Sequence, residues 1–84
     1  MPLISYDVQK NTKVPKYRVI KEFIISSIVS GSFAADEQLP TEYALMEQYG
    51  TSRVTVRRAL KELQEEGYIY SIQGKGTFCN YSDE

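Results

Sequence analysis

The stretch from residue 51 to residue 67 constrains the fold of this chain more than any other. Its apolar residues recur three, four and seven positions after the first, and they are Val56, Ala59, Leu60 and Leu63. Gly50 precedes the stretch and Gly67 ends it, and glycine readily takes the left-handed conformation that reverses a chain. Ser52 stands where a capping hydroxyl would begin a helix. The stretch therefore predicts an amphipathic helix with one buried face.

The opposite side of this predicted helix is basic. Between residues 51 and 61 the chain has four positive charges and no acid, although its net charge is only -1. At about 100 degrees per residue, the outward arc collects Val54, Arg57, Arg58 and Lys61, with Thr55 on one flank and Arg53 in the exposed first turn. Acidic residues lie before and after this segment, so the average hides a local basic patch. Such a patch suits either a nucleic-acid groove or a solvated helix face.

Two further helices are predicted earlier in the chain. The apolar residues of the first recur at helical spacing within residues 16–30, and they are Tyr17, Ile20, Ile24 and Ile28. Pro15 suits the first turn of this helix, and Gly31 suits its end. After a connector in which Leu39 is an expected core residue, Thr41 is the expected cap of a short helix that ends near Tyr49.

The last predicted element of the chain is a β-hairpin. Two β-prone runs, 68–72 and 77–80, flank the sequence Gln73-Gly74-Lys75-Gly76. We expect its large apolar residues to pack the hairpin on the first helix, and they are Tyr68, Ile69, Tyr70, Ile72 and Phe78. Helix, helix, tight glycine turn, helix and hairpin in this order predict an α+β, mainly α fold. Its architecture would be a winged helix-turn-helix with three helices and a β-hairpin wing.

The domain boundaries follow from these elements. Residues 15–80 are predicted to form one winged helix-turn-helix domain, and a chain of 84 residues has room for one small core. Residues 1–14 are polar and without period, so we expect a flexible N-terminal arm. Residues 81–84 are expected to begin a linker to a missing C-terminal domain.

Several functions are disfavoured by what the chain lacks. It has no run of about 18 apolar residues and no secretory signal, so we expect no membrane partner and a cytoplasmic location. It has no histidine, and Cys79 is its single cysteine, so we expect no metal site and no cofactor. General acid and base groups beside a nucleophile are also missing, so we expect no enzymatic activity.

Three segments in register resemble one protein family. They are Leu39-Pro40-Thr41-Glu42, the run from Ser52 to Leu60 that continues to Leu63 and Gly67, and Gln73-Gly74-Lys75-Gly76-Thr77-Phe78. With the spacing of Pro15, Tyr17 and Gly31, they cover about 65 residues. Over this length the chain resembles the N-terminal DNA-binding domain of the GntR family of bacterial transcription regulators. The Gly-Lys-Gly-Thr-Phe ending most resembles the HutC-type branch.

The resemblance implies sequence-specific binding of double-stranded DNA by the operator-reading domain of a transcription regulator. It implies a repressor, since repression is the commoner mode in relatives, and a homodimer in the full-length protein that reads a pseudo-palindromic operator. It also implies a small effector that binds a separate C-terminal domain. The residues leave one alternative open, a winged helix that serves as a protein-interaction module.

Residues of the basic helix suit this role. In the family the positions that match Arg53 and Arg57 contact DNA, and a guanidinium fork matches the O6 and N7 acceptors of guanine. Val54 can touch a thymine methyl. The hydroxyls and remaining charges are expected at phosphates or water, and they are Thr41, Thr51, Ser52, Thr55, Arg58 and Lys61.

The glycines of the predicted wing tip suit a close approach to DNA. Gly74 and Gly76 let the backbone approach the duplex, while Lys75 and Gln73 can reach minor-groove or phosphate oxygens. In the family this wing enters the minor groove.

Three residues before the basic helix, Asp36, Glu42 and Tyr43, have other expected roles. Asp36 stands where the family usually has glycine, so the turn before the second helix is expected to differ in shape. Tyr43 stands where relatives often have a DNA-contacting arginine, and either its hydroxyl reaches a phosphate or its ring is partly buried. Glu42 is expected to stabilise a helix N-terminus or pair with a nearby arginine.

Overall fold

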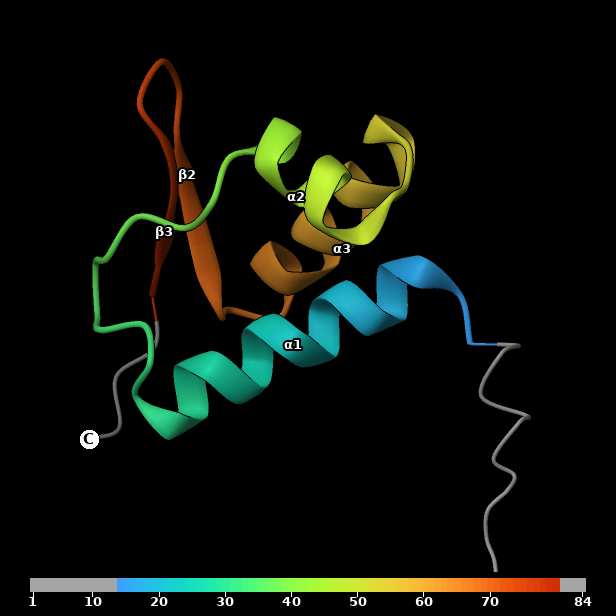
Figure 1. The fold of residues 1–84 in the computed structure, drawn as a ribbon. Helices are drawn as coiled ribbons and strands as arrows, with labels where there is room; N and C mark the ends of the chain where they lie inside the picture. The colour runs from blue at the N-terminus through green and yellow to red at the C-terminus, as the bar shows by residue number, and fades with distance from the viewer. Residues whose placement is uncertain (1–13, 81–84) are drawn as a thin grey trace, which may run out of the picture.

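The computed structural model describes residues 14–80, and its elements follow the predicted order (Figure 1). The helices are α1 (Lys16–Ser30), α2 (Glu42–Tyr49) and α3 (Arg53–Glu65), and the strands are β2 (Ile69–Ile72) and β3 (Gly76–Cys79). The two strands form an antiparallel hairpin. The predicted winged helix-turn-helix is therefore confirmed. Residues 1–13 of the predicted arm (1–14) and the predicted linker at 81–84 lie outside the described residues.

Two hydroxyls begin the helices of the helix-turn-helix. The Thr41 side chain accepts a hydrogen bond from the Ala44 backbone N–H at 3.0 Å. The Ser52 side chain accepts one from the Thr55 N–H at 3.2 Å. Each hydroxyl satisfies a backbone donor that has no partner within its helix, so both predicted caps are confirmed.

The other predicted helix ends need one correction. Gly31 and Gly50 end α1 and α2 in the left-handed conformation, as their positions predicted. Gly67 also has a positive φ, of 88°, and follows the end of α3. Pro15 lies one residue before α1, so its predicted place in the first turn was wrong. Its backbone is extended, with ψ of 147°, so only its carbonyl takes part in the helix by accepting the first hydrogen bonds.

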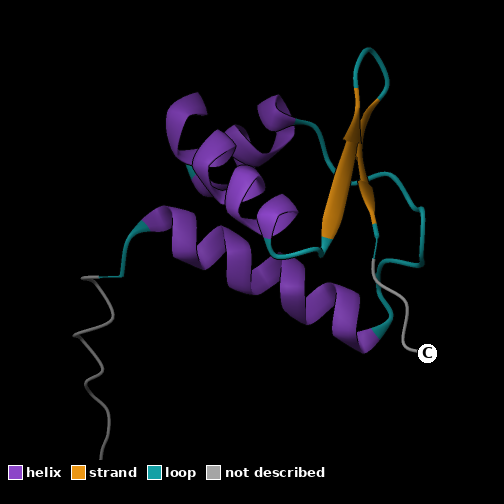
Figure 2. Ribbon diagram, turned by 180° about the vertical axis from the view of Figure 1, so that it is seen from behind, coloured by secondary structure: helices purple, strands orange, loops and turns teal. Residues whose placement is uncertain are grey.

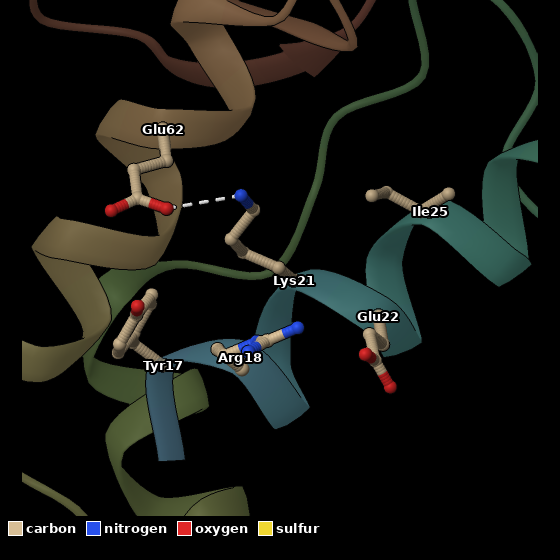
Figure 3. Close-up of a pocket in the computed structure, with 6 residues that line it drawn as sticks. All are labelled: Tyr17, Arg18, Lys21, Glu22, Ile25 and Glu62. Atoms are coloured by element: carbon tan, nitrogen blue, oxygen red, sulfur yellow. Dashed lines mark hydrogen bonds and ion pairs between the residues drawn. The ribbon is translucent and has the colours of Figure 1, made fainter. Parts of the chain in front are cut away.

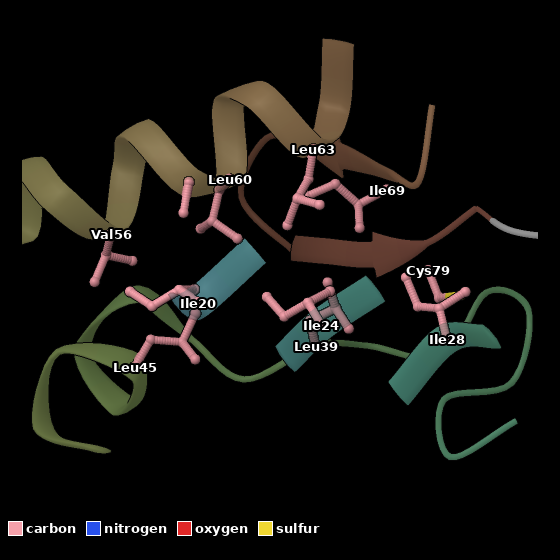
Figure 4. Close-up of a cluster of buried hydrophobic side chains, with 11 residues drawn as sticks. Ile20, Ile24, Ile28, Leu39, Leu45, Val56, Leu60, Leu63, Ile69 and Cys79 are labelled. Carbon is pink, nitrogen blue, oxygen red and sulfur yellow. The ribbon is translucent and has the colours of Figure 1, made fainter. Parts of the chain in front are cut away.

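The core lies between α1, α3 and the base of the hairpin (Figure 4). The buried faces of α1 and α3 follow the predicted helical spacing, and the connector, α2 and the two strands add further buried residues. The buried residues are Ile20, Ile24, Ile28, Leu39, Leu45, Val56, Ala59, Leu60, Leu63, Ile69 and Cys79. Figures 1 and 2 show α1 crossing one side of the molecule, with the hairpin tip, α2 and the start of α3 on the other side. The core therefore fixes α3 relative to the hairpin.

The hairpin packs through fewer residues than predicted. Ile69 and Cys79 pair across the two strands and are buried, whereas Ile72 is 41% exposed. Tyr70 and Phe78 pair at the next position and stack with ring centroids 5.6 Å apart. Because successive side chains of a strand point to opposite faces, these rings lie on the face away from the core. The expectation that Tyr70, Ile72 and Phe78 would pack in the core was wrong.

A third extended segment runs beside β3. The Asp36 N–H donates to the Cys79 carbonyl at 2.7 Å, the Cys79 N–H donates to the Glu37 carbonyl at 2.9 Å, and the Leu39 N–H donates to the Thr77 carbonyl at 2.8 Å. These bonds join residues 36–39 to the hairpin edge. They also fix the start of α2 relative to the wing.

Asp36 keeps the backbone conformation that a glycine would take. Its φ is 65°, and within residues 14–80 it is the one non-glycine residue with positive φ. Aspartate tolerates this left-handed conformation better than most residues. The Tyr70 hydroxyl donates to the Asp36 carboxylate at 2.7 Å, and this hydrogen bond raises the pKa of the Tyr70 phenol. The turn at Asp36 is therefore left-handed, and its side chain contacts the wing.

A charged cluster joins α1 to the C-terminal half of α3. The Lys21 ammonium lies 3.0 Å from a Glu62 carboxylate oxygen (Figure 3). It also lies 2.8 Å from an oxygen of Glu66, the residue that follows α3. The Glu66 and Glu62 contacts raise the pKa of Lys21. The Lys21 and Arg58 contacts lower the pKa of Glu62.

These shifts predict how stability depends on pH. Because the pKa of Glu62 is lowered in the folded state, its ion pairs stabilise the fold fully above the ordinary pKa of 4.5. This stabilisation is lost as the pH falls through the pKa of the folded state. Because the pKa of Lys21 is raised in the folded state, its ion pairs stabilise the fold fully below the ordinary pKa of 10.5. This stabilisation is lost as the pH rises through the pKa of the folded state. The free energies of unfolding of the unaltered chain and of Lys21→Met, measured with urea, should therefore differ most between pH 4.5 and pH 10.5. A difference that stays constant into strong acid would contradict the assignment.

Candidate nucleic-acid interface

A tight turn places α3 directly after α2. Gly50 reverses the chain with φ of 60°, and the Thr51 N–H donates to the Met46 carbonyl at 3.1 Å. Ser52 then caps α3. This local geometry places the start of α3 beside α2, with Arg53 and Val54 of its first turn exposed to solvent. The turn is the middle element of a helix-turn-helix.

The predicted outward arc of α3 is exposed to solvent. The exposed fractions of the side chains are 52% for Arg53, 67% for Arg57, 58% for Arg58 and 74% for Lys61. Val54 is 78% exposed, more than any other large apolar residue in the described part of the chain. The buried face of the same helix belongs entirely to the core. The arc therefore presents four cations and one apolar side chain to a partner.

Glu42 joins the two arginines that were predicted to read bases. Its carboxylate lies 2.7 Å from Nη1 of Arg53 and 3.6 Å from Nε of Arg57. This agrees with the expectation that Glu42 pairs with a nearby arginine. Exposed ion pairs of this kind contribute only about 0 to 1 kcal/mol, so they are exchanged readily for a stronger partner.

The other two cations of the arc are also paired. Arg58 lies 3.2 Å from Glu62, and Lys61 lies 3.5 Å from Glu65, both one turn later on α3. The sequence has no acid between residues 51 and 61, but the fold brings a carboxylate beside each cation of the arc. Glu42 reaches the arginines because α2 packs against α3. Glu62 and Glu65 lie beside their partners because they follow them by one helical turn.

Arg58 differs from the other cations in its surroundings. Its guanidinium lies over the Tyr17 ring of α1, 3.8 Å from the ring centroid, besides pairing with Glu62. It therefore occupies the flank of α3 that faces α1. Tyr17 was predicted as a core residue, and its contact with Arg58 was not foreseen.

Predicted hydroxyl contacts gather at the starts of α2 and α3. Ser52 and Thr55 contact each other through their side-chain oxygens at 3.1 Å, and Thr51 precedes them in the turn. Thr41 is exposed at the start of α2. The free backbone N–H groups and helix dipoles at these two helix starts favour an anion such as phosphate.

Tyr43 lies on the exposed side of α2. Its ring is 62% exposed, and its hydroxyl donates to the Glu47 carboxylate at 2.8 Å. Of the two alternatives drawn from the sequence, the partly buried ring does not match this position. The hydroxyl remains accessible to an incoming group.

The wing tip shares a recess with the start of α3. Residues 73–76 are exposed, with φ of 82° at Gly74 and 130° at Gly76. A recess of 360 Å³ opens between the wing and the helices, and its lining includes Gln38, Thr41, Glu42, Tyr43, Arg53 and Lys75. The structure thus brings together predicted residues from α2, α3 and the tip. Gln38 was not foreseen, because an isolated glutamine in a connector carries no sequence signal.

Other kinds of site find little support in residues 14–80. No group of three or more metal-ligating side chains occurs among them. In the same part of the chain, no helix has both the length and the apolar character needed to cross a lipid bilayer.

The fold and the exposed basic arc of α3 define a winged helix-turn-helix domain. The family model for bacterial regulatory proteins of the gntR family matches residues 16–79, and the chain belongs to this family. The resemblance seen in the sequence is therefore confirmed.

Relatives of known role are regulators. The chain is 49% identical over 71 residues to the arabinose metabolism transcriptional repressor of Geobacillus stearothermophilus, covering 84% of this chain and 20% of the repressor. It is 39% identical over 69 residues to the histidine utilization repressor of Klebsiella aerogenes, covering 82% of this chain and 29% of that protein. The second relative agrees with the predicted HutC-type branch. The chain spans less than a third of the length of either relative.

Solved structures of similar fold include complexes with DNA. The crystal structure of AraR(DBD) in complex with operator ORR3 matches with a TM-score of 0.77 and 42% identity, covering 94% of this chain and 89% of that one. The crystal structure of AraR(DBD) in complex with operator ORE1 matches with a TM-score of 0.78 and 44% identity, covering 93% of this chain and 89% of that one.

Proposed function

We propose that this chain binds double-stranded DNA as the operator-reading domain of a bacterial transcription regulator. The observation that carries the proposal is the exposed arc of α3, where Arg53 and Arg57 lie one turn apart beside a single carboxylate. This arc belongs to a fold that AraR(DBD) uses in complex with its operators. A major groove is wide enough to admit such a helix.

Base reading would proceed by exchange of partners. On docking, the Arg53 and Arg57 guanidinium groups leave Glu42 and donate to O6 and N7 of guanine. The exchange costs little because the ion pairs are exposed. Val54, between them in sequence, would contact a thymine methyl.

Phosphate contacts would fix the orientation of the domain. The hydroxyls and N–H groups at the starts of α2 and α3 would bind the backbone on either side of the groove. Tyr43 and Lys61 are exposed and would add phosphate contacts. Arg58 would reach a phosphate from the flank near α1. Lys75 at the wing tip would bind the adjacent minor groove, with Gln73 beside it.

The full-length regulator would act as a homodimer on a pseudo-palindromic operator. Two copies of this domain would then bind half-sites related by a two-fold axis. A small effector would bind outside residues 14–80 and control repression in the cytoplasm. Because a single copy lacks the gain in effective concentration of two linked copies, this chain alone would bind weakly.

The proposal is tested by duplex binding over a salt series. Fluorescence anisotropy with a labelled duplex should show affinity that falls linearly with log salt. Lys75→Ala should weaken all duplexes nearly alike and lower the salt slope by about one unit, whereas Lys75→Arg should keep the slope. Absence of binding in dilute buffer, even with two tethered copies, would refute DNA binding and favour a protein-interaction module.

A further inference from the structure

The wing tip is built from residues with little conformational restraint of their own. Gly74 and Gly76 both have positive φ, and the turn is closed by a hydrogen bond from the Lys75 N–H to the Ile72 carbonyl at 2.9 Å. The backbone ladder with residues 36–39 reaches only as far as Thr77. Residues 73–76 therefore extend beyond the part of the hairpin that the ladder holds.

The Gln38 side chain reaches this tip from outside the hairpin. The Gln38 side-chain amide donates through Nε2 to the Lys75 carbonyl at 3.0 Å. A Cβ atom on Gly76 would come within 2.6 Å of the same Nε2, so the amide lies directly against Gly76 as well. Within residues 14–80, no other side-chain hydrogen bond joins residues 73–76 to a residue outside the hairpin.

Gln38 is also tied to the base-reading side chains. It precedes Thr41, the cap of α2, by three residues, and Glu42 by four. Glu42 in turn lies 2.7 Å from Arg53. Gln38, Glu42, Arg53 and Lys75 all line the same recess of 360 Å³. A short path through Gln38 thus connects the wing tip to the start of α3.

We propose that Gln38 is a positioning residue that holds the wing tip at a fixed distance from the start of α3. This inference rests on the proposed DNA binding and deepens it. With the tip held before DNA arrives, the minor-groove contact of Lys75 needs less ordering on binding. Gln38 acts through the Lys75 backbone, so it affects affinity without selecting bases at α3.

The experiment compares isosteric and truncated variants with a matched control. Gln38→Glu keeps the side-chain size but replaces the N–H donor with a carboxylate, and Gln38→Ala removes the amide without adding charge. Gln48→Glu and Gln48→Ala make the same changes at an exposed glutamine of α2. For each chain, ¹⁵N relaxation of Gly74, Lys75 and Gly76 is measured without DNA, and Kd is measured with one duplex.

Both Gln38 variants should lower the order parameters of the tip amides and leave those of α3 unchanged. Gln38→Ala should also raise Kd about threefold to tenfold, the range expected for loss of one neutral hydrogen bond. Gln38→Glu should raise Kd further, because its added carboxylate repels phosphates. The ranking of duplexes that differ at single base pairs should not change. The Gln48 variants should leave tip order unchanged and alter Kd less than the matching Gln38 variants.

Two results would overturn the inference. Unchanged tip order in both Gln38 variants would mean that the amide does not hold the tip. Reduced tip order with an unchanged Kd would mean that the held tip does not serve binding. If the unaltered chain binds no duplex at all, the proposed function fails instead, and the relaxation data still decide whether Gln38 holds the tip.

Discussion

Replacing Arg53 with alanine is expected to remove base preference at one or two positions of the bound site. The guanidinium of Arg53 is exposed at the first turn of α3 and, among residues 14–80, is paired only with Glu42, so it can donate to a guanine edge. Loss of such a bidentate pair costs about 1 to 3 kcal/mol, or roughly 5-fold to 150-fold in Kd for the preferred duplex. Selection of bound sequences from a random duplex pool at fixed salt, with the unaltered and variant chains, measures this loss.

A second variant separates base reading from charge. Arg53→Lys keeps the positive charge but loses the planar fork, so it should retain binding to arbitrary duplexes while losing the same base preference. Arg58→Ala removes an arginine held against Tyr17 and Glu62, and it should weaken all duplexes alike without changing the selected motif. A selected motif that survives Arg53→Ala unchanged would show that the role assigned to Arg53 is wrong.

Val56→Ala is expected to lower the free energy of unfolding by about 2 kcal/mol. The Val56 side chain is fully buried between α3 and the rest of the core. The truncation removes apolar contacts and leaves a cavity that a small core cannot easily close. For a domain of this size, such a loss is a large part of the total stability. Urea unfolding followed by circular dichroism measures the change.

Val54 provides a matched control on the same helix. It lies two residues before Val56 but is 78% exposed, so Val54→Ala should change the free energy of unfolding by less than about 0.5 kcal/mol. The same variant should weaken binding to the preferred duplex if Val54 contacts a thymine methyl. Equal destabilisation by the two substitutions would contradict the orientation of α3.

Local sequence signals predicted the helices well because their causes are local. Thr41 and Ser52 cap helices through backbone groups three residues away, and Gly31 and Gly50 end helices through their own backbone conformation. The inward face of α3 followed from spacing alone. None of these features needs knowledge of the rest of the chain.

The hairpin was harder to predict because its burial depends on which face meets the core. Its residues are apolar on both faces, so composition could not show that Ile69 and Cys79 point inward while Tyr70 and Phe78 stack outside. The contact of Asp36 with Tyr70 was likewise not predictable, because it joins residues 34 positions apart.

The sequence predicted the residues of the candidate site but not the ion pairs and contacts that they make. The exposed positions of Arg53, Arg57 and Lys61 followed from helical geometry. The position of Glu42 beside both arginines depends on how α2 packs on α3, and that of Arg58 over Tyr17 depends on α1. Such contacts between elements leave no periodic signal in the sequence.

We expect α3 and the wing tip together to form the surface that meets DNA. Titration of the ¹⁵N-labelled chain with a duplex, followed by amide chemical shifts, tests it most directly. We predict that the largest shifts fall at residues 51–58 and 73–76, with little change at the C-terminal end of α1 around Val29. Shifts centred on α1, or none at residues 51–58, would contradict the account.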